Sequence, residues 1–487
     1  MAQNNSMAKS AMYNMIAKFG QMAIQLVIQM VLARLINAAD FGVVAIITVA
    51  LNFLNMFADM GLGVSIIQKS DLNEDDIGNV FSASMYIGVV LTLIMILLAY
   101  PISHIYNNPV YMQLFTMSSI IALFNSLNVV PNALIMREKR FDLVALRTIL
   151  INAVAGVVAI LAAFSGAKYY ALVLNYFLSS VGIFIWNYMS TKERGLRIKF
   201  KIQIRSLTTF MGKYSLFQFL FNIMNYFTRN LDYLLVGAYM GETTLGYYQK
   251  AYTMNLYPNQ LFTNVISAVF HPYMRAYKHD YKKMYEKWVE INTLLSVVAA
   301  TVMCIMFFCS EEIILIMFGD NWKTAIGCLH WLSICVWAQM LSSTCGAVFL
   351  SAGRTDQTFK CGVVNVLIIL LALAVGLWIK DIDAVAFAIG MAYNIIFLIT
   401  LLILVKWTLH QRIKTVLKRI VPDFLACLIF MAIVQMKNIT IGNNIFARLI
   451  CKCAIVCAYM LFYLFATRKL NTIYLLFRKT MKSILKK

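Results

Sequence analysis

The chain is short of charged residues and of proline. Only 13% of its 487 residues are charged and only 6 are proline, whereas 61% are hydrophobic. A soluble domain averages about 25% charged residues. The apolar residues come in blocks of roughly twenty, the length that an α-helix needs to cross a bilayer. No alternating ten-residue pattern recurs, which argues against a transmembrane β-barrel. The sequence therefore predicts an all-α polytopic membrane protein.

Motifs for catalysis and for secretion are also missing. The sequence has no P-loop, HExxH or GxSxG motif. The ten cysteines lack the spacing of a metal site. Asp381-Ile-Asp383 has the letters of a glycosyltransferase motif, but it falls on the outer side of the topology below, where nucleotide sugars are absent. The N-terminus lacks the features of a cleaved signal peptide. We therefore expect no enzyme activity, no cofactor and no cleaved signal peptide.

Apolar runs separated by polar breaks give fourteen candidate membrane spans. Lysine and arginine test this count, because cytoplasmic loops are enriched in them. Of the 42 basic residues, 32 fall in loops and tails on the N-terminal side, 4 on the opposite side and 6 inside spans. We therefore predict about 14 transmembrane helices with both termini in the cytoplasm. The net charge of +21 then reflects topology and anionic lipid rather than nucleic acid. The predicted spans lie near 11–36, 41–67, 80–100, 112–136, 146–165, 170–190, 214–237, 244–271, 288–309, 325–351, 361–379, 384–405, 421–436 and 445–466.

The chain repeats itself after 204 residues. This shift places Phe41-Gly42 over Leu245-Gly246, and the first two spans over the seventh and eighth. Spans 1 and 7 both run outward, so the two six-helix repeats are parallel, as in transporters that move two halves around a central site. We predict an N-lobe at 1–206 with helices 1–6, a C-lobe at 207–407 with helices 7–12, and two extra helices with a basic cytoplasmic tail at 408–487.

Polar residues form stripes on equivalent helices of the two halves. In spans 1 and 7 they recur every three or four residues, which puts them on one helix face. One interpretation is hydrogen bonding between helices, worth around 0.6 kcal/mol per bond. We favour the wall of a water-filled cavity, because the stripe is long and repeated. The predicted substrate-binding residues are Asn14, Lys18, Gln21 and Gln25 in span 1, Gln218, Asn222, Asn225 and Arg229 in span 7, and Tyr248, Lys250, Tyr252, Asn255 and Asn259 in span 8.

Arg229 and Asp232 stand in the apolar run NYFTRNLDYLLVGAYMG. A charge at the centre of a span costs roughly 2.5–3.5 kcal/mol on insertion, so it has to be paired or hydrated. The two side chains form either a mutually neutralising pair or a substrate-binding arginine beside a carboxylate that responds to a proton or cation. Asp59, a lone carboxylate on the polar face of span 2, is the second candidate for ion coupling.

Several segments resemble one family of membrane proteins. LARLINAADFGVVAI, FADMGLGVSIIQKS, RNLDYLLVGAYMGETTLGYYQKAY, MFGDNWKTAIGCL and LSAGRTDQTFK are similar to Wzx-type polysaccharide transporters of the MOP superfamily, which includes the MATE-like exporters. The resemblance covers about residues 11–407 and is strongest to the colanic- and teichuronic-acid branch. It implies a flippase that carries an undecaprenyl-pyrophosphate-linked oligosaccharide from the cytoplasmic to the outer leaflet. It also implies alternating access coupled to H⁺ or Na⁺.

Two other functions stay open at this point. A MATE-like multidrug or cation antiporter would want a pocket dominated by carboxylates, and the cationic stripes disfavour it. A membrane-embedded polysaccharide polymerase or ligase would need a sizeable outer loop, and the predicted outer loops are short. We expect a monomer in the bacterial inner membrane, with lipid-linked oligosaccharide as substrate and no nucleic-acid partner. A polysaccharide polymerase and glycosyltransferases are candidate contacts.

Overall fold

The computed structural model describes residues 2–69, 72–198, 204–437 and 444–470. Side chains are described for these residues except in 2–17, 204–221, 263–269 and 271–272 and at Gln68, Arg194 and Thr355. The regular elements of the described residues are all helices. Two compact units divide the chain, residues 1–246 and 247–487.

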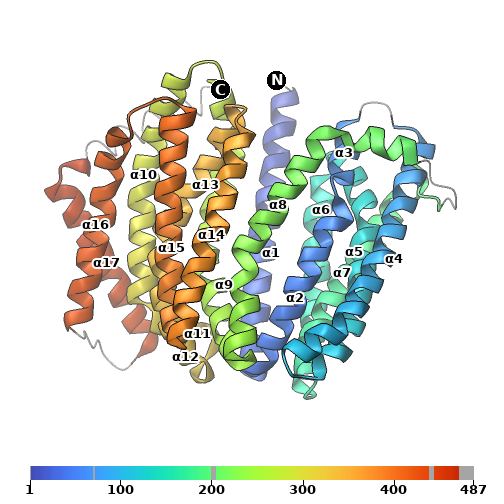
Figure 1. Cartoon of the computed structure of the whole chain (residues 1–487), viewed down its shortest axis with the longest axis horizontal. Coiled ribbons are helices and arrows are strands. Elements are labelled where there is room, and N and C mark those ends of the chain that lie inside the picture. Colours follow the sequence, from blue (N-terminus) through green and yellow to red (C-terminus); the bar gives the residue numbers. More distant parts are fainter. Residues whose placement is uncertain (1, 70–71, 199–203, 438–443, 471–487) are drawn as a thin grey trace. The chain divides into compact units, whose positions relative to one another are not determined.

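The first unit is built around α5 (Val110–Arg137). This helix packs against α2, α3, α4 and α7, while α1 packs along α6 and α8 along α2 (Figure 1, blue to green). The other elements of the unit are α1 (Ala2–Leu35), α2 (Ala38–Asp59), α3 (Leu62–Gln68), α4 (Glu74–Ile105), α6 (Phe141–Phe164), α7 (Tyr169–Thr191), η1 (Lys192–Arg194) and α8 (Ile204–Met240).

The second unit is built around α10 (Tyr281–Phe308). This helix packs against α13, α16 and α17, and α14 packs along α15 (Figure 1, yellow to red). Buried Trp288, Trp337 and Phe349 belong to its apolar core. The other elements are α9 (Glu242–Arg275), which begins in the first unit, α11 (Ser310–Phe318), η2 (Asp320–Trp322), α12 (Thr324–Leu332), η3 (Ser333–Cys335), α13 (Val336–Ser351), α14 (Thr355–Ile379), α15 (Ile382–Leu402), η4 (Ile403–Thr408), α16 (Ile413–Lys437) and α17 (Ile445–Ala466).

The compact units divide the chain at a different place from the sequence repeat. The repeat predicts a lobe boundary at 206/207, whereas the units meet between Gly246 and Tyr247. The physical reason is that α8 packs along α2 of the first unit. The last two helices, α16 and α17, pack on α10 and so belong to the second unit. The lobe boundaries that the sequence repeat predicts therefore stay a prediction.

Helices occupy all the predicted spans. Ten helical segments in the described residues are long and apolar enough to cross a membrane. The four predicted spans outside these ten lie in α1, α8, α9 and α16. Three of these four helices carry the polar stripes, and α16 carries Asp423. The helical, multi-pass fold is therefore confirmed, while the count of fourteen spans and the cytoplasmic termini stay predictions.

The first turns of α2 and α9 cross so closely that only glycine fits at two positions. A Cβ atom on Gly42 would lie 1.9 Å from the carbonyl oxygen of Glu242, and a Cβ atom on Gly246 would lie 1.9 Å from that of Ala38. Each of these residues is 204 positions from its counterpart in the other contact. The crossing is therefore reciprocal, as in a two-fold interface, and it supports the internal repeat independently of the sequence pattern.

The loop between α4 and α5 holds the end of α8 and the start of α9. The hydroxyl of Tyr106 donates to the carbonyl of Leu234 at 2.9 Å. The amide of Asn108 donates to both carboxylate oxygens of Glu242, at 2.8 and 3.1 Å. Burial raises the pKa of Tyr106 to about 12, so its phenol keeps the proton that it donates at any physiological pH. These contacts fix the hairpin between α8 and α9 at the glycine crossing.

Two fully buried carboxylates anchor the last helices of the second unit. Glu312 forms an ion pair with Lys452 of α17 at 2.8 Å. Asp423 of α16 accepts hydrogen bonds from Tyr463 and Lys469, at 2.7 and 2.6 Å. A buried charge without a partner is strongly unfavourable. These contacts therefore decide where α16 and α17 pack on the unit.

Removing Lys452 should destabilise the protein. Lys452→Met removes the shortest ion pair of Glu312. Breaking a buried ion pair costs about 3–5 kcal/mol. We expect a clearly lower melting temperature in detergent. Lys452→Met combined with Glu312→Gln should recover most of the loss. The control is Lys323→Met, because the Lys323–Asp320 pair is exposed and such pairs contribute at most about 1 kcal/mol. Equal losses of melting temperature in Lys452→Met and Lys323→Met would show that the buried ion pair contributes no more than the exposed one.

Candidate functional site

The polar stripe of α1 is exposed. Lys18, Gln21 and Gln25 are all exposed along one face of the helix. Beside them, α1 packs closely on α6, since a Cβ atom on Gly156 would lie 2.0 Å from Cδ1 of Ile28. The helix thus buries one side in the unit and leaves its amides and lysine accessible. The side chains of Asn14 and Gln218, also predicted for the stripes, lie outside the described residues.

The stripe of α8 separates its two charges. Asn222 and Arg229 are exposed and Asn225 is half-buried, whereas Asp232 is only 3% exposed. The carboxylate of Asp232 accepts the backbone N–H of Tyr233 at 2.9 Å. Among the described residues, Arg229 forms no ion pair or hydrogen bond. The two charges therefore do not form a neutralising pair in this structure.

Aromatic contacts hold α8 against α2 and leave Arg229 accessible. The rings of Phe53 and Phe227 lie 5.4 Å apart between centroids. The hydroxyl of Tyr226 donates to the backbone carbonyl of Val49. Arg229 is two or three residues from these contacts, and its side chain stays exposed.

The predicted residues of α9 are placed differently, because most of them are buried in the second unit. Tyr248, Lys250, Tyr252 and Asn255 are at most 3% exposed, and Asn259 is half-buried. The hydroxyls of Tyr252 and Tyr393 are hydrogen bonded at 2.9 Å. The amide of Asn255 donates to Sγ of Cys335 at 3.3 Å. Their role in substrate binding stays a prediction, and it would require α9 to become accessible.

Lys250 joins two of the segments that carry the family resemblance. Its ammonium lies 5.2 Å from the ring centroid of Phe318 and 5.8 Å from that of Trp322. Tyr247 meets Trp322 edge to face at 5.7 Å. Gly319, with φ 90° and ψ −178°, makes the turn that presents both rings. Lys250 therefore packs α9 against the aromatic rings at the end of α11 and in η2.

Asp59 lies at the break between α2 and α3. Met60 and Gly61 have positive φ angles of 36° and 86° and end α2. The carboxylate of Asp59 is exposed and accepts the backbone N–H of Gly63 at 3.0 Å. It therefore caps the first turn of α3. Its role in ion coupling, like that of Asp232, stays a prediction.

Sequence reasoning missed a further polar stripe, on α5. Asn125, Asn128 and Asn132 are spaced three and four residues apart, a signal that could have been read from the sequence. Together they bond three neighbouring helices: Asn125 donates to Asn55 of α2 at 3.0 Å, Asn187 of α7 donates to Asn128 at 2.6 Å, and Arg147 of α6 donates to Asn132 at 2.6 Å. Arg147, which the charge count placed in a basic loop, is only 4% exposed.

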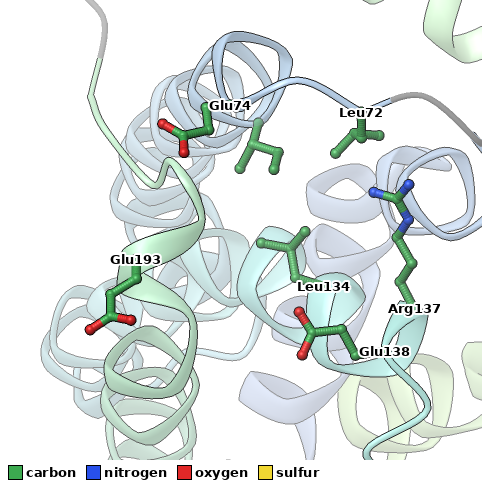
Figure 2. A pocket seen from close by; sticks show the side chains of 7 residues that line it. Leu72, Glu74, Leu134, Arg137, Glu138 and Glu193 are labelled. Atoms are coloured by element: carbon green, nitrogen blue, oxygen red, sulfur yellow. The ribbon is translucent and has the colours of Figure 1, made fainter.

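A pocket of about 430 Å³ lies where α4 begins and α5 ends (Figure 2). In Figure 2, Glu193 and Glu74 come from separate segments, while Arg137 and Glu138 come from the end of α5. None of the predicted cavity residues lines this pocket. Its lining consists of Leu72, Glu74, Ile77, Leu134, Arg137, Glu138 and Glu193.

The fold of the chain is similar to that of two solved membrane transport proteins. A solved structure described as the lipid II flippase MurJ in an inward closed conformation matches with a TM-score of 0.74 at 14% identity, covering 94% of this chain and 99% of that one. An inward-facing multidrug resistance MATE family transporter of the MOP superfamily matches with a TM-score of 0.58 at 13% identity, covering 86% and 96%. At these identities the likeness shows the fold alone.

The chain belongs to the family described as "Polysaccharide biosynthesis protein", which matches residues 31–327, more than half of its length. The teichuronic acid biosynthesis protein TuaB of Bacillus subtilis (strain 168) is 23% identical over 309 residues. The match covers 63% of this chain and 63% of the length of TuaB. The lipopolysaccharide biosynthesis protein WzxC of Escherichia coli (strain K12) is 21% identical over 360 residues, which cover 71% of this chain and 70% of WzxC. The family predicted from the sequence segments is therefore confirmed.

Cysteines introduced on the stripes should report which residues meet water. Gln25→Cys and Asn222→Cys should react with a charged methanethiosulfonate reagent in lipid bilayers about ten times faster than Asn255→Cys, because thiolate reactivity requires exposure to water. The background needs serine at Cys451 and Cys457, which are exposed. A thiol that faces lipid stays neutral and unreactive. Equally slow labelling at all three positions would therefore contradict a water-filled cavity.

Proposed function

We propose that the protein is a flippase for an undecaprenyl-pyrophosphate-linked oligosaccharide. It moves this repeat unit of a capsule, O-antigen or exopolysaccharide from the cytoplasmic to the outer leaflet of the bacterial inner membrane by alternating access. The observation that carries the proposal is the exposed polar stripe of α8, in which Arg229 has no partner among the described residues. Membership of a polysaccharide biosynthesis family on a transporter fold supports it.

The chemistry of the stripes suits a sugar joined to a diphosphate. Arg229 presents a planar cation that binds phosphate oxygens through charge-assisted hydrogen bonds. The amides of Gln21, Gln25 and Asn222 both donate and accept hydrogen bonds, as sugar hydroxyls require. These side chains are exposed in the first unit. A substrate that contains both a diphosphate and a sugar would therefore bind both the arginine and the amides.

The same groups argue against the alternative of a multidrug or cation antiporter. A cationic drug would need carboxylates in an accessible site. The exposed residues of the α1 and α8 stripes are amides and cations, and the one carboxylate in the sequences of these two helices, Asp232, is buried. A polymerase or ligase would in addition need catalytic groups in a large outer loop, and the predicted outer loops are short.

The proposal includes coupling to a proton or sodium gradient. Asp232 is a buried carboxylate three residues from Arg229 on α8. A carboxylate in an apolar surrounding takes up a proton or a cation readily when it becomes accessible, because its isolated charge is costly there. Asp59 at the α2–α3 break is the second candidate, since binding of an ion would compete with its cap on Gly63.

Arg229→Ala should abolish polysaccharide export. The variant removes the cation that we expect to hold the diphosphate, so lipid-linked intermediates should accumulate in the cell while surface polysaccharide falls to background. Immunoblotting of membranes checks that the protein is inserted and abundant. The matched control is Arg34→Ala, because Arg34 is also exposed but lies off the stripe. Normal export by Arg229→Ala would remove Arg229 from the substrate site.

Neutralising the coupling carboxylate should flatten the response to the ion gradient. We expect that Asp232→Asn, measured in proteoliposomes with an imposed proton or sodium gradient, translocates at a rate that no longer depends on the gradient. Asp59→Asn is tested in parallel. Asp320→Asn serves as the control because this residue lies in an exposed ion pair. An unchanged gradient dependence in both test variants would assign the coupling to other residues.

A further inference from the structure

We propose that the first unit contains a buried anion-binding site centred on Arg147, between α5, α6 and α7. The site is separate from the stripes of α1 and α8. It takes a small anion of the phosphate or halide class, either a free ion or the phosphate of a lipid headgroup.

Arg147 is a buried cation with most of its hydrogen-bonding capacity unused. Its side chain is 4% exposed, and its Nη2 group donates to Asn132 at 2.6 Å. The Nε and Nη1 atoms are buried and have no hydrogen-bond acceptor. A buried guanidinium is strongly unfavourable unless a negative charge and acceptors compensate it.

The surrounding helices hold no residue that could supply this negative charge. The sequences of α1, α5 and α7 contain no aspartate or glutamate. The one acid of α6 is Asp142, which is exposed and forms no ion pair with Arg147 among the described residues. By contrast, buried Lys452 has Glu312 as its partner. Glu138 and Glu193, which follow α5 and α7, line the pocket of Figure 2, and no carboxylate of the described residues binds the Nε or Nη1 atom of Arg147. We therefore expect the compensating anion to come from outside the chain.

A second buried polar group lies one turn away. Asn187 is fully buried, and its amide donates to Asn128 at 2.6 Å, but its Oδ1 atom has no partner. Asn128 and Asn132 are four residues apart on α5, so they present Asn187 and Arg147 along the same face. Turning over the amides of Asn187 and Asn128 preserves their hydrogen bond and presents an N–H donor at the open position instead. An anion beside Arg147 would supply the acceptor that this donor needs.

The position of Arg147 suits either source of the anion. The residue stands in the second turn of α6, which begins at Phe141, roughly 9 Å along the helix. In the predicted topology this is the cytoplasmic end, at the depth of lipid phosphates. The two nitrogens of Arg147 that lack an acceptor, Nε and Nη1, can bind a single ion or the oxygens of one phosphate.

The site can be tested by melting the full-length protein in a neutral maltoside detergent. Starting from delipidated protein in sodium gluconate, we expect chloride or phosphate at matched ionic strength to raise the melting temperature saturably, by roughly 2–4 °C. Arg147→Gln should lose this response. Arg140→Gln, which changes an exposed arginine nearby, should keep it. A shift that requires phosphatidylglycerol and is absent with phosphatidylcholine or free ions would identify a lipid headgroup as the source.

A second variant keeps the test decisive if Arg147→Gln does not fold. Asn132→Asp places a carboxylate where the amide now accepts from Arg147. It should raise the melting temperature in gluconate and abolish the response to anions. The matched control is Asn125→Asp on the same helix, whose side chain bonds Asn55 and Ser180; it should retain the response. A wild-type melting temperature that ignores every anion and phosphatidylglycerol would overturn the site, as would an undiminished response in Asn132→Asp.

Discussion

The cost of placing charge in an apolar surrounding governs this structure. Several buried ionic groups among the described residues bind an opposite charge, because an uncompensated charge there is strongly unfavourable. Glu312 with Lys452 and Asp423 with Lys469 join helices that are more than forty residues apart in sequence. Lys250 meets the same requirement through two aromatic rings. The packing of the second unit depends on these contacts.

We expect the functional site where a charged side chain is exposed and is not neutralised by a neighbouring charge. The stripe of α8 keeps Arg229 exposed and without an ion pair or hydrogen bond among the described residues, so water or a substrate has to supply its partner. The nearby carboxylate of Asp232 is buried and does not neutralise Arg229. An anionic substrate can therefore bind the arginine without first breaking an ion pair. This separation of the two charges on one helix is what distinguishes α8 from the helices that only support the fold.

Hydropathy and charge predicted the helices well, because both patterns are local. The repeat likewise aligned Gly42 with Gly246, which the structure shows in reciprocal contacts. The exposure of side chains was harder to predict. Tyr252 and Asn255 are buried because their partners, Tyr393 and Cys335, lie 141 and 80 residues away, and no local pattern reveals such partners.

The exposure of Arg147 was also not predicted from the sequence, because it was counted with a basic loop and is buried. Its position near a basic loop predicted a topology signal, yet its side chain is only 4% exposed and donates to Asn132 of α5. The signal that would have located it was the spacing of Asn125, Asn128 and Asn132, which marks the face of α5 that bonds its neighbours. Charge counting therefore missed the burial of Arg147, and the spacing of its asparagine partners on α5 marks the helix face that it contacts.

The proposed translocation of a lipid-linked oligosaccharide can be measured on the purified protein. The most direct measurement reconstitutes the purified protein in liposomes that carry a fluorescent polyprenyl-pyrophosphate-linked oligosaccharide in both leaflets, and then adds a glycosidase outside. The account predicts that digestion continues past the outer-leaflet fraction when the protein is present, and stops there in protein-free liposomes. Digestion that stops at the outer leaflet in both preparations, together with uptake of a cationic dye by the same vesicles, would contradict the account.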